Sequence, residues 1–150
     1  MGMQSYETRG FGIEFDHHCG TNTTGDKIRE LLKLAPQFKE EIVEQFKDWE
    51  IEYEDATVDD FADIEQDFYT GIPYIIAKVI NERYDCDFME ALSDENSKLY
   101  LLMCRCMPWQ MSDFEKQLTE EKLTEIIGEH YRILYDDVVN IGDVSVYNFG

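Results

Sequence analysis

Residues 71–84 read GIPYIIAKVINERY, a largely apolar segment of the chain. Gly71 interrupts the preceding segment, because glycine breaks regular structure. The following residues predict a largely apolar helix over residues 72–84, whose apolar members include Ile75, Ile76, Val79 and Ile80. A strongly acidic segment precedes this helix, and two predicted strands follow it.

Two strands separated by a polar turn are predicted on the C-terminal side, over residues 87–93 and 98–107. The run from Leu99 to Met103 is almost continuously apolar, which predicts a central and covered strand. The clearest helix covers residues 119–135, with Thr119 as its N-cap and His130 on its apolar face as a core histidine. A final strand is predicted around residues 144–147.

On the N-terminal side, the alternation of Phe11, Ile13 and Phe15 with Gly12 and Glu14 predicts a strand over residues 6–15. A polar loop follows over residues 16–25. Three helices are predicted between this loop and Gly71. The first is capped by Thr23 and runs to Ala35, the second runs from Pro36 to a frayed end near Trp49, and the third is capped by Thr57. The third is expected to span residues 57–69, with Val58, Phe61, Ile64 and Phe68 facing inwards.

The resulting order β-α-α-α-α-β-β-α-β predicts an α+β protein. We expect a single domain over residues 1–150, with a mainly antiparallel sheet of about four strands and helices packed on one side. No apolar run has the length of a membrane span. Four cysteines without a secretion signal (Cys19, Cys86, Cys104 and Cys106) predict reduced thiols in the cytoplasm.

Charge is the most unusual property of the chain, whose formal net charge is −20. Residues 48–77 hold ten carboxylates and no Lys or Arg, and aromatic residues are interleaved with the acids. Self-repulsion on this scale opposes folding and is not needed for solubility. The charge also disfavours direct binding of nucleic acid or of an anionic membrane, because phosphate groups require clustered Lys and Arg.

An acidic surface with aromatic anchors instead predicts a non-enzymatic protein that binds a basic partner. Its carboxylates would imitate the phosphates of nucleic acid and occupy a basic nucleic-acid-binding surface. The predicted partner-binding residues are Trp49, Glu50, Glu52, Tyr53, Glu54, Asp55, Asp59, Asp60, Asp63 and Asp67. No catalytic residue, metal or cofactor is expected.

Two alternatives remain open. The first is a metal-dependent enzyme that uses His17, His18 and Cys19 with Cys104 and Cys106, although these residues lack the ligand spacing of structural zinc sites. The second is a homo-oligomer that associates through residues 103–111, which are rich in Met and contain a Trp.

Several short segments carry a resemblance to known proteins. They are Gly10-Phe11-Gly12-Ile13, residues 75–82, Tyr100-Leu101-Leu102, Met107-Pro108-Trp109 and residues 118–123. Together they resemble small acidic proteins of unassigned function from Firmicutes phages and integrated mobile elements. That class includes anti-CRISPR and other anti-defence inhibitors, some of which mimic DNA. The resemblance implies an inhibitor whose partner is a nucleic-acid-handling protein such as a Cas effector, and it implies no particular functional residue.

Overall fold

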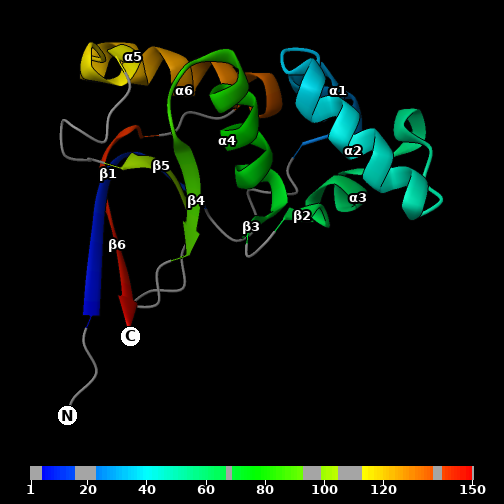
Figure 1. Cartoon of the computed structure of the whole chain (residues 1–150), viewed down its shortest axis with the longest axis horizontal. Helices are drawn as coiled ribbons and strands as arrows, with labels where there is room; N and C mark the ends of the chain where they lie inside the picture. Colours follow the sequence, from blue (N-terminus) through cyan, green and yellow to red (C-terminus); the bar gives the residue numbers. More distant parts are fainter. Residues whose placement is uncertain are drawn as a thin grey trace.

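The computed structural model describes residues 5–15, 23–66, 69–92, 99–104, 113–136 and 140–149. Strands β1 (Ser5–Phe15), β4 (Phe88–Leu92), β5 (Leu99–Cys104) and β6 (Gly142–Phe149) pair antiparallel in the order β4-β5-β1-β6 (Figure 1). Along β1, Phe11 and Ile13 are buried and Glu14 is exposed, as the sequence predicts, but Gly12 is buried as well, so the described residues do not alternate strictly. The apolar strand β5 lies between β4 and β1, as expected for a central strand.

Helix α4 (Gly71–Arg83) lies at the centre of the molecule (Figure 1). Most of its side chains are buried, because apolar residues occupy nearly all sides of the helix. It packs against β4 and β5 on one side and against α1 (Gly25–Leu32), α2 (Pro36–Asp48) and α3 (Val58–Ala62) on the other. Residues 71–84 therefore join the strands to the helical end of the protein.

The remaining helices are α5 (Asp113–Lys116) and α6 (Glu120–Leu134). Helix α6 contacts β1, α1 and α4. Its N-cap is confirmed, since the Thr119 side chain accepts a hydrogen bond from the amide of Lys122 at 3.1 Å. None of the helices in the described part of the chain combines the length and apolar character that crossing a membrane requires.

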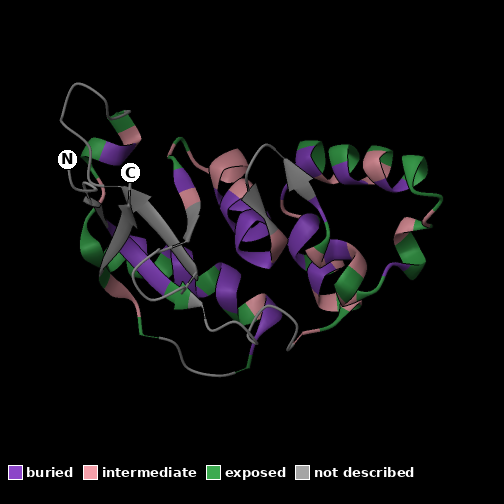
Figure 2. Cartoon of the chain, turned by 90° about the horizontal axis from the view of Figure 1, so that it is seen from below, coloured by how far each residue is buried: buried purple, intermediate pink, exposed green. Residues whose placement is uncertain are grey.

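The predicted fold class, a mainly antiparallel sheet of about four strands with helices packed on one side, is wrong as a description of the whole protein, although β4, β5, β1 and β6 do pair antiparallel. The described residues form a mainly helical α+β protein with six α-helices, and they include a separate, small two-stranded antiparallel sheet. Helices α1, α2 and α3 pack on α4 and extend the molecule sideways (Figure 2). The physical reason is α4, whose apolar surface needs cover on both sides.

The third predicted helix is also wrong in length. Helix α3 ends at Ala62, and the chain then forms β2 (Glu65–Gln66), which pairs with β3 (Tyr69–Thr70). Ile64 is buried beyond the helix, so its spacing from Phe61 imitates helical periodicity without belonging to a helix. Phe68 and Asp67 lie outside the described residues.

A smaller correction concerns the start of α1. The N-cap is Thr24 rather than Thr23, and its side chain accepts from the amide of Lys27 at 3.2 Å. Ala35, predicted to close this helix, lies after it and precedes α2. Pro36 begins α2, as predicted from its fixed φ and missing amide hydrogen.

Candidate partner-binding surface

The predicted surface is centred on an acidic loop (residues 48–63) that begins where α2 ends. The amide of Ile51 donates to the carbonyl of Phe46 at 2.8 Å, and the amide of Glu50 donates to Lys47 at 3.1 Å. These two bonds form a Schellman motif, which requires one residue in the left-handed conformation. That residue is Glu50, with φ of 60°. The predicted frayed helix end is therefore a defined turn.

The two predicted aromatic anchors have different environments. Trp49 leaves 39% of its surface exposed while its ring contacts Phe46 at a centroid distance of 5.9 Å. Tyr53 packs against Phe46 at 6.4 Å and against Phe61 at 5.9 Å, and its hydroxyl oxygen is buried. Burial raises the pKa of Tyr53 to about 12, and the charge of Glu54 adds to the rise. Trp49 is thus accessible to a partner, whereas Tyr53 belongs largely to the packing beneath the loop.

Arg29 of α1 fixes the middle of the acidic loop. Its Nη1 donates to the carbonyl oxygens of Tyr53 at 3.1 Å and Ala56 at 2.9 Å, and its Nη2 pairs with Asp26 at 2.6 Å. The first turn of α1 approaches so closely that a Cβ at Gly25 would lie 2.5 Å from the carbonyl oxygen of Ala56. The loop backbone is therefore held by α1 as well as by its own turns.

A capping box orders the end of the loop. The Thr57 side chain accepts from the amide of Asp60 at 3.3 Å, and the Asp60 carboxylate accepts from the amide of Thr57 at 2.9 Å. These reciprocal bonds begin α3 and confirm Thr57 as its N-cap. Asp60, predicted as a binding residue, therefore has a structural role, whereas its neighbours Asp59 and Asp63 are exposed.

Seven carboxylates of the acidic loop are exposed, and none of them forms an ion pair within the described part of the chain. They are Asp48 and the predicted binding residues Glu50, Glu52, Glu54, Asp55, Asp59 and Asp63. The loop forms the right-hand end of the molecule in Figures 1 and 2, at the far end from β1 and β6. The remaining predicted residue, Asp67, lies outside the described residues.

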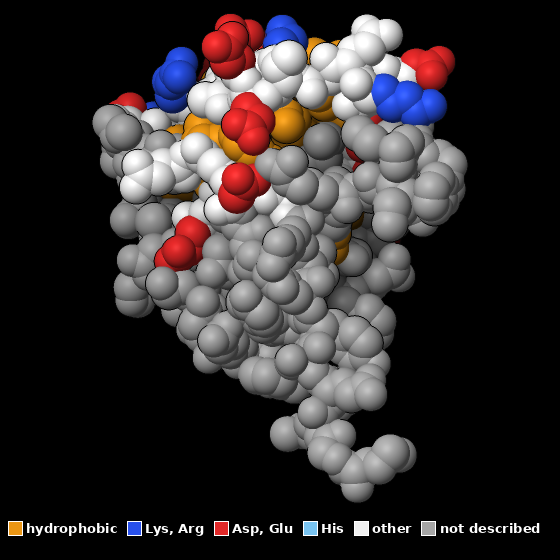
Figure 3. Space-filling view, turned by 90° about the vertical axis from the view of Figure 1, so that its left-hand side faces the viewer, with side chains coloured by type: hydrophobic (Ala, Val, Ile, Leu, Met, Phe, Trp, Pro, Cys, Tyr) orange, Lys and Arg blue, Asp and Glu red, His pale blue; other side chains and the backbone are white. Residues whose placement is uncertain are grey.

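Basic residues of α1 and α2 lie closer to this loop than the sequence indicates. The Nζ of Lys39 lies 5.3 Å from the centroid of the Tyr53 ring. The pKa of Lys33 is raised, first because Glu30 accepts its hydrogen bond and to a smaller extent because of the charge of Glu54. The absence of Lys and Arg from residues 48–77 therefore overstates the local imbalance of charge. Acidic side chains also occur at the opposite end, beside hydrophobic surface (Figure 3).

The metal alternative falls mostly outside the described residues. His17, His18, Cys19 and Cys106 are not described, and Cys104 is described only through its backbone, opposite Gly10. Within the described ranges, no group of three or more His, Cys, Asp or Glu side chains could hold a metal ion. Residues 105–112, which include Trp109 of the proposed oligomer interface, also lie outside those ranges.

His130 is confirmed as a buried histidine with hydrogen-bond partners. Its Nδ1 lies 2.6 Å from the carbonyl oxygen of Ile126, and its Nε2 lies 3.0 Å from Nη1 of Arg83. A carbonyl only accepts and a guanidinium only donates, so the ring must be neutral with its hydrogen on Nδ1. Burial lowers the pKa of His130, and Arg83 lowers it further, which maintains this neutral form.

The sequence did not reveal Arg29 as the residue that fixes the acidic loop. Its two carbonyl partners lie 24 and 27 positions away, and only the i, i+3 pairing with Asp26 has a local signal. The chain was compared with models of protein families, with curated proteins and with solved structures, and none of them matches.

Proposed function

We propose that this protein is a non-enzymatic acidic binding protein that occupies a basic nucleic-acid-binding surface of a partner. The observation that carries the proposal is the set of exposed carboxylates of the acidic loop that form no ion pair among the described residues. They repel one another and contribute nothing evident to packing, so they cost stability in the isolated protein. A basic partner would convert that cost into attraction and would speed the encounter.

The arrangement suits imitation of nucleic acid because the acids are carried on a backbone fixed by Arg29, by the Schellman motif and by the capping box. A pre-ordered surface loses less conformational freedom on binding than a disordered acidic tail. The resemblance to small acidic proteins of phages and mobile elements suggests the biological setting in which such a partner would be met. The proposed role is a cytoplasmic inhibitor of a nucleic-acid-handling defence protein, such as a Cas effector.

Competition with DNA tests this proposal. A purified Cas effector with its guide RNA is bound to fluorescently labelled target DNA, and displacement is followed by anisotropy at about 0.05 M and about 0.5 M salt. We expect the protein to displace the DNA, and the high salt to weaken this competition. The variant Asp59→Lys with Asp63→Lys should lose it. Asp60 is left unchanged because its reversal would disrupt the α3 cap.

The matched control is Glu40→Lys with Glu121→Lys. Both residues are exposed, lie outside the acidic loop, and form no ion pair in the described part of the chain. The two double variants change the net charge equally. If they competed equally well, total charge rather than the acidic loop would control binding, and the assigned surface would be wrong.

A further inference from the structure

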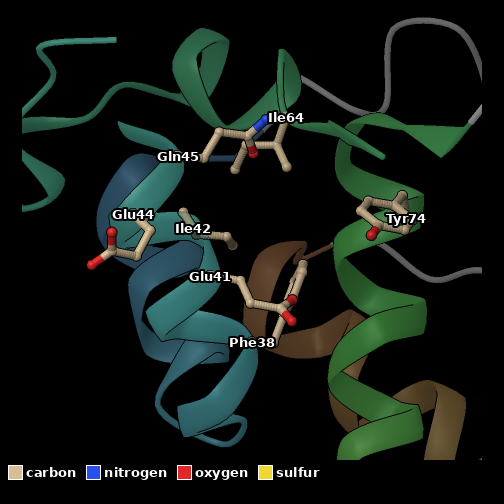
Figure 4. Close-up of a pocket in the computed structure, with 7 residues that line it drawn as sticks. All are labelled: Phe38, Glu41, Ile42, Glu44, Gln45, Ile64 and Tyr74. Atoms are coloured by element: carbon tan, nitrogen blue, oxygen red, sulfur yellow. The ribbon is translucent and has the colours of Figure 1, made fainter. Parts of the chain in front are cut away.

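A hollow of about 430 Å³ opens between α2 and α4, next to the acidic loop (Figure 4). Its floor is apolar and consists of Phe38, Ile42, Ile64 and Tyr74. Its rim carries Glu41, Glu44 and Gln45 of α2. The volume lies within the range of sites that hold small ligands or anchoring side chains.

The floor of the hollow is preformed. Each of its four side chains is at most 7% exposed, so the core already fixes their positions. The Phe38 and Tyr74 rings meet edge to face at a centroid distance of 6.0 Å, and Lys78 Nζ lies 5.6 Å from the centroid of the Phe38 ring. An apolar side chain that enters would therefore displace water without requiring the protein to rearrange.

The charge of the rim selects the kind of occupant. Glu41 is exposed and forms no ion pair within the described residues, and Glu44 is exposed with a long 3.4 Å contact to Lys47. Glu41 also borders a second hollow of about 260 Å³, which contains Lys78 and Glu82. Glu82 is already used there, since its carboxylate accepts from the amides of Gln37 and Phe38 at the start of α2. The first hollow thus combines an apolar floor with an acidic rim.

The hollow is continuous with the acidic loop at two points. Ile64 directly follows Asp63, the last residue of the loop, and Gln45 lies one turn before Asp48, the first residue. A partner that lies along the loop would therefore reach the hollow. A second copy of this chain is a poor occupant, because its net charge is also −20.

We propose that this hollow anchors the basic partner by receiving an amphipathic helix with apolar side chains on one face and Arg or Lys on the others. The apolar side chains enter the hollow and contact Phe38, Ile42, Ile64 and Tyr74, and the cations pair with Glu41 and Glu44. This inference rests on the proposed function, since it names the anchoring site of the same partner. The hollow also gives the partner an apolar contact in place of the predicted anchor Tyr53, whose ring packs inside the protein against Phe46 and Phe61.

A synthetic peptide tests the hollow without knowledge of the partner. The probe is a helix of about three turns with leucines on one face and arginines elsewhere, capped at both ends. Its control carries serine in place of each leucine, so its charge is unchanged. We expect the parent protein to bind the leucine peptide at least about tenfold more tightly, which corresponds to about 1.4 kcal/mol. Equal affinity for the two peptides would overturn the proposal.

Two protein variants locate the binding. Gln45→Phe fills the hollow at unchanged charge, and Glu41→Lys with Glu44→Lys reverses its rim. Each variant should lower the affinity for the leucine peptide by about tenfold or more. The control Glu40→Lys with Glu121→Lys changes the net charge as much as the rim variant does but leaves the hollow intact, and it should weaken binding by less than about threefold. Circular dichroism and thermal melting verify that each variant is folded.

The outcomes separate this inference from the proposed function. If Gln45→Phe binds the leucine peptide as the parent does, the hollow is rejected, while DNA competition by the acidic loop is unaffected. If the parent dimerises in light scattering and Gln45→Phe abolishes the dimer, the occupant is a second copy and the proposal is wrong. If the hollow variants lose the peptide but no variant alters DNA competition, the hollow is retained and the proposed function is rejected.

Discussion

Replacing Glu50 with glycine should stabilise the protein. Glu50 occupies the left-handed position of the Schellman motif that ends α2, with φ of 60°. A side chain at this conformation costs about 1–2 kcal/mol. Glycine removes this cost, but it also increases the conformational freedom of the unfolded chain. That increase destabilises the folded protein by about 0.4–1 kcal/mol. Taken at the midpoints of these two ranges, the net gain should be about 0.8 kcal/mol. For a chain of this size, this corresponds to a rise in Tm of about 1–4 °C.

The assay is urea unfolding followed by circular dichroism, with the parent and three variants measured side by side. Glu52→Gly is the matched control, because Glu52 has φ of −75° and gains nothing from glycine. It should lose about 0.4–1 kcal/mol through the unfolded chain alone. Glu50→Gln removes the same charge as Glu50→Gly but keeps the side chain, so it measures relief of repulsion in the acidic loop.

Opposite shifts at the two glutamates are the decisive result. If Glu50→Gly and Glu52→Gly both lower the unfolding midpoint, the left-handed turn does not strain the chain. If Glu50→Gln alone reproduces the whole gain, charge rather than backbone conformation explains it. Either result would refute the reasoning from the turn.

Three further perturbations follow from the structure. Burial lowers the pKa of His130 below the ordinary 6.5. Its stabilising contribution is therefore complete above pH 6.5 and is lost as the pH falls through the lower pKa of the folded state. In urea unfolding at several pH values, His130→Gln should flatten this part of the stability profile. Asp60→Ala should cost about 1 kcal/mol by removing the α3 cap, while Asp59→Ala changes stability by less than about 0.5 kcal/mol in the same measurement. Gly25→Ala should cost about 1–3 kcal/mol, because its Cβ would meet a backbone oxygen at 2.5 Å, and Gly142→Ala, with open space around it, is the thermal-melting control.

Local patterns predicted the elements whose signals lie within a few residues. Helix α6 has a threonine cap and a regular apolar stripe, and the apolar residues Phe11 and Ile13 of β1 are buried whereas the neighbouring Glu14 is exposed. Helix α2 begins at a proline suited to a first turn. In each case the residues that define the element are neighbours in the sequence, so no tertiary contact is needed to infer it.

Tertiary contacts determined the features that the sequence did not reveal. Ile64 continues the helical spacing of Phe61 and is buried as that spacing predicts, yet α3 has already ended at Ala62. The sideways extension of α1, α2 and α3 depends on α4 being covered from two directions. The fixed position of the acidic loop depends on Arg29, whose carbonyl partners are remote in sequence. Periodicity measures burial and does not distinguish burial in a helix from burial beside one.

Trp49 and Glu50 are adjacent residues that do not suit folding at their positions. Trp49 exposes 39% of a large apolar side chain, and Glu50 adopts a conformation that glycine would adopt at lower cost. Natural sequences depart from local rules mainly where another requirement applies, and binding surfaces are common sites of such departures. Both residues belong to the acidic loop, beside carboxylates that form no ion pair among the described residues. The two departures are independent of net charge, so they support the proposed surface on grounds that composition alone does not provide.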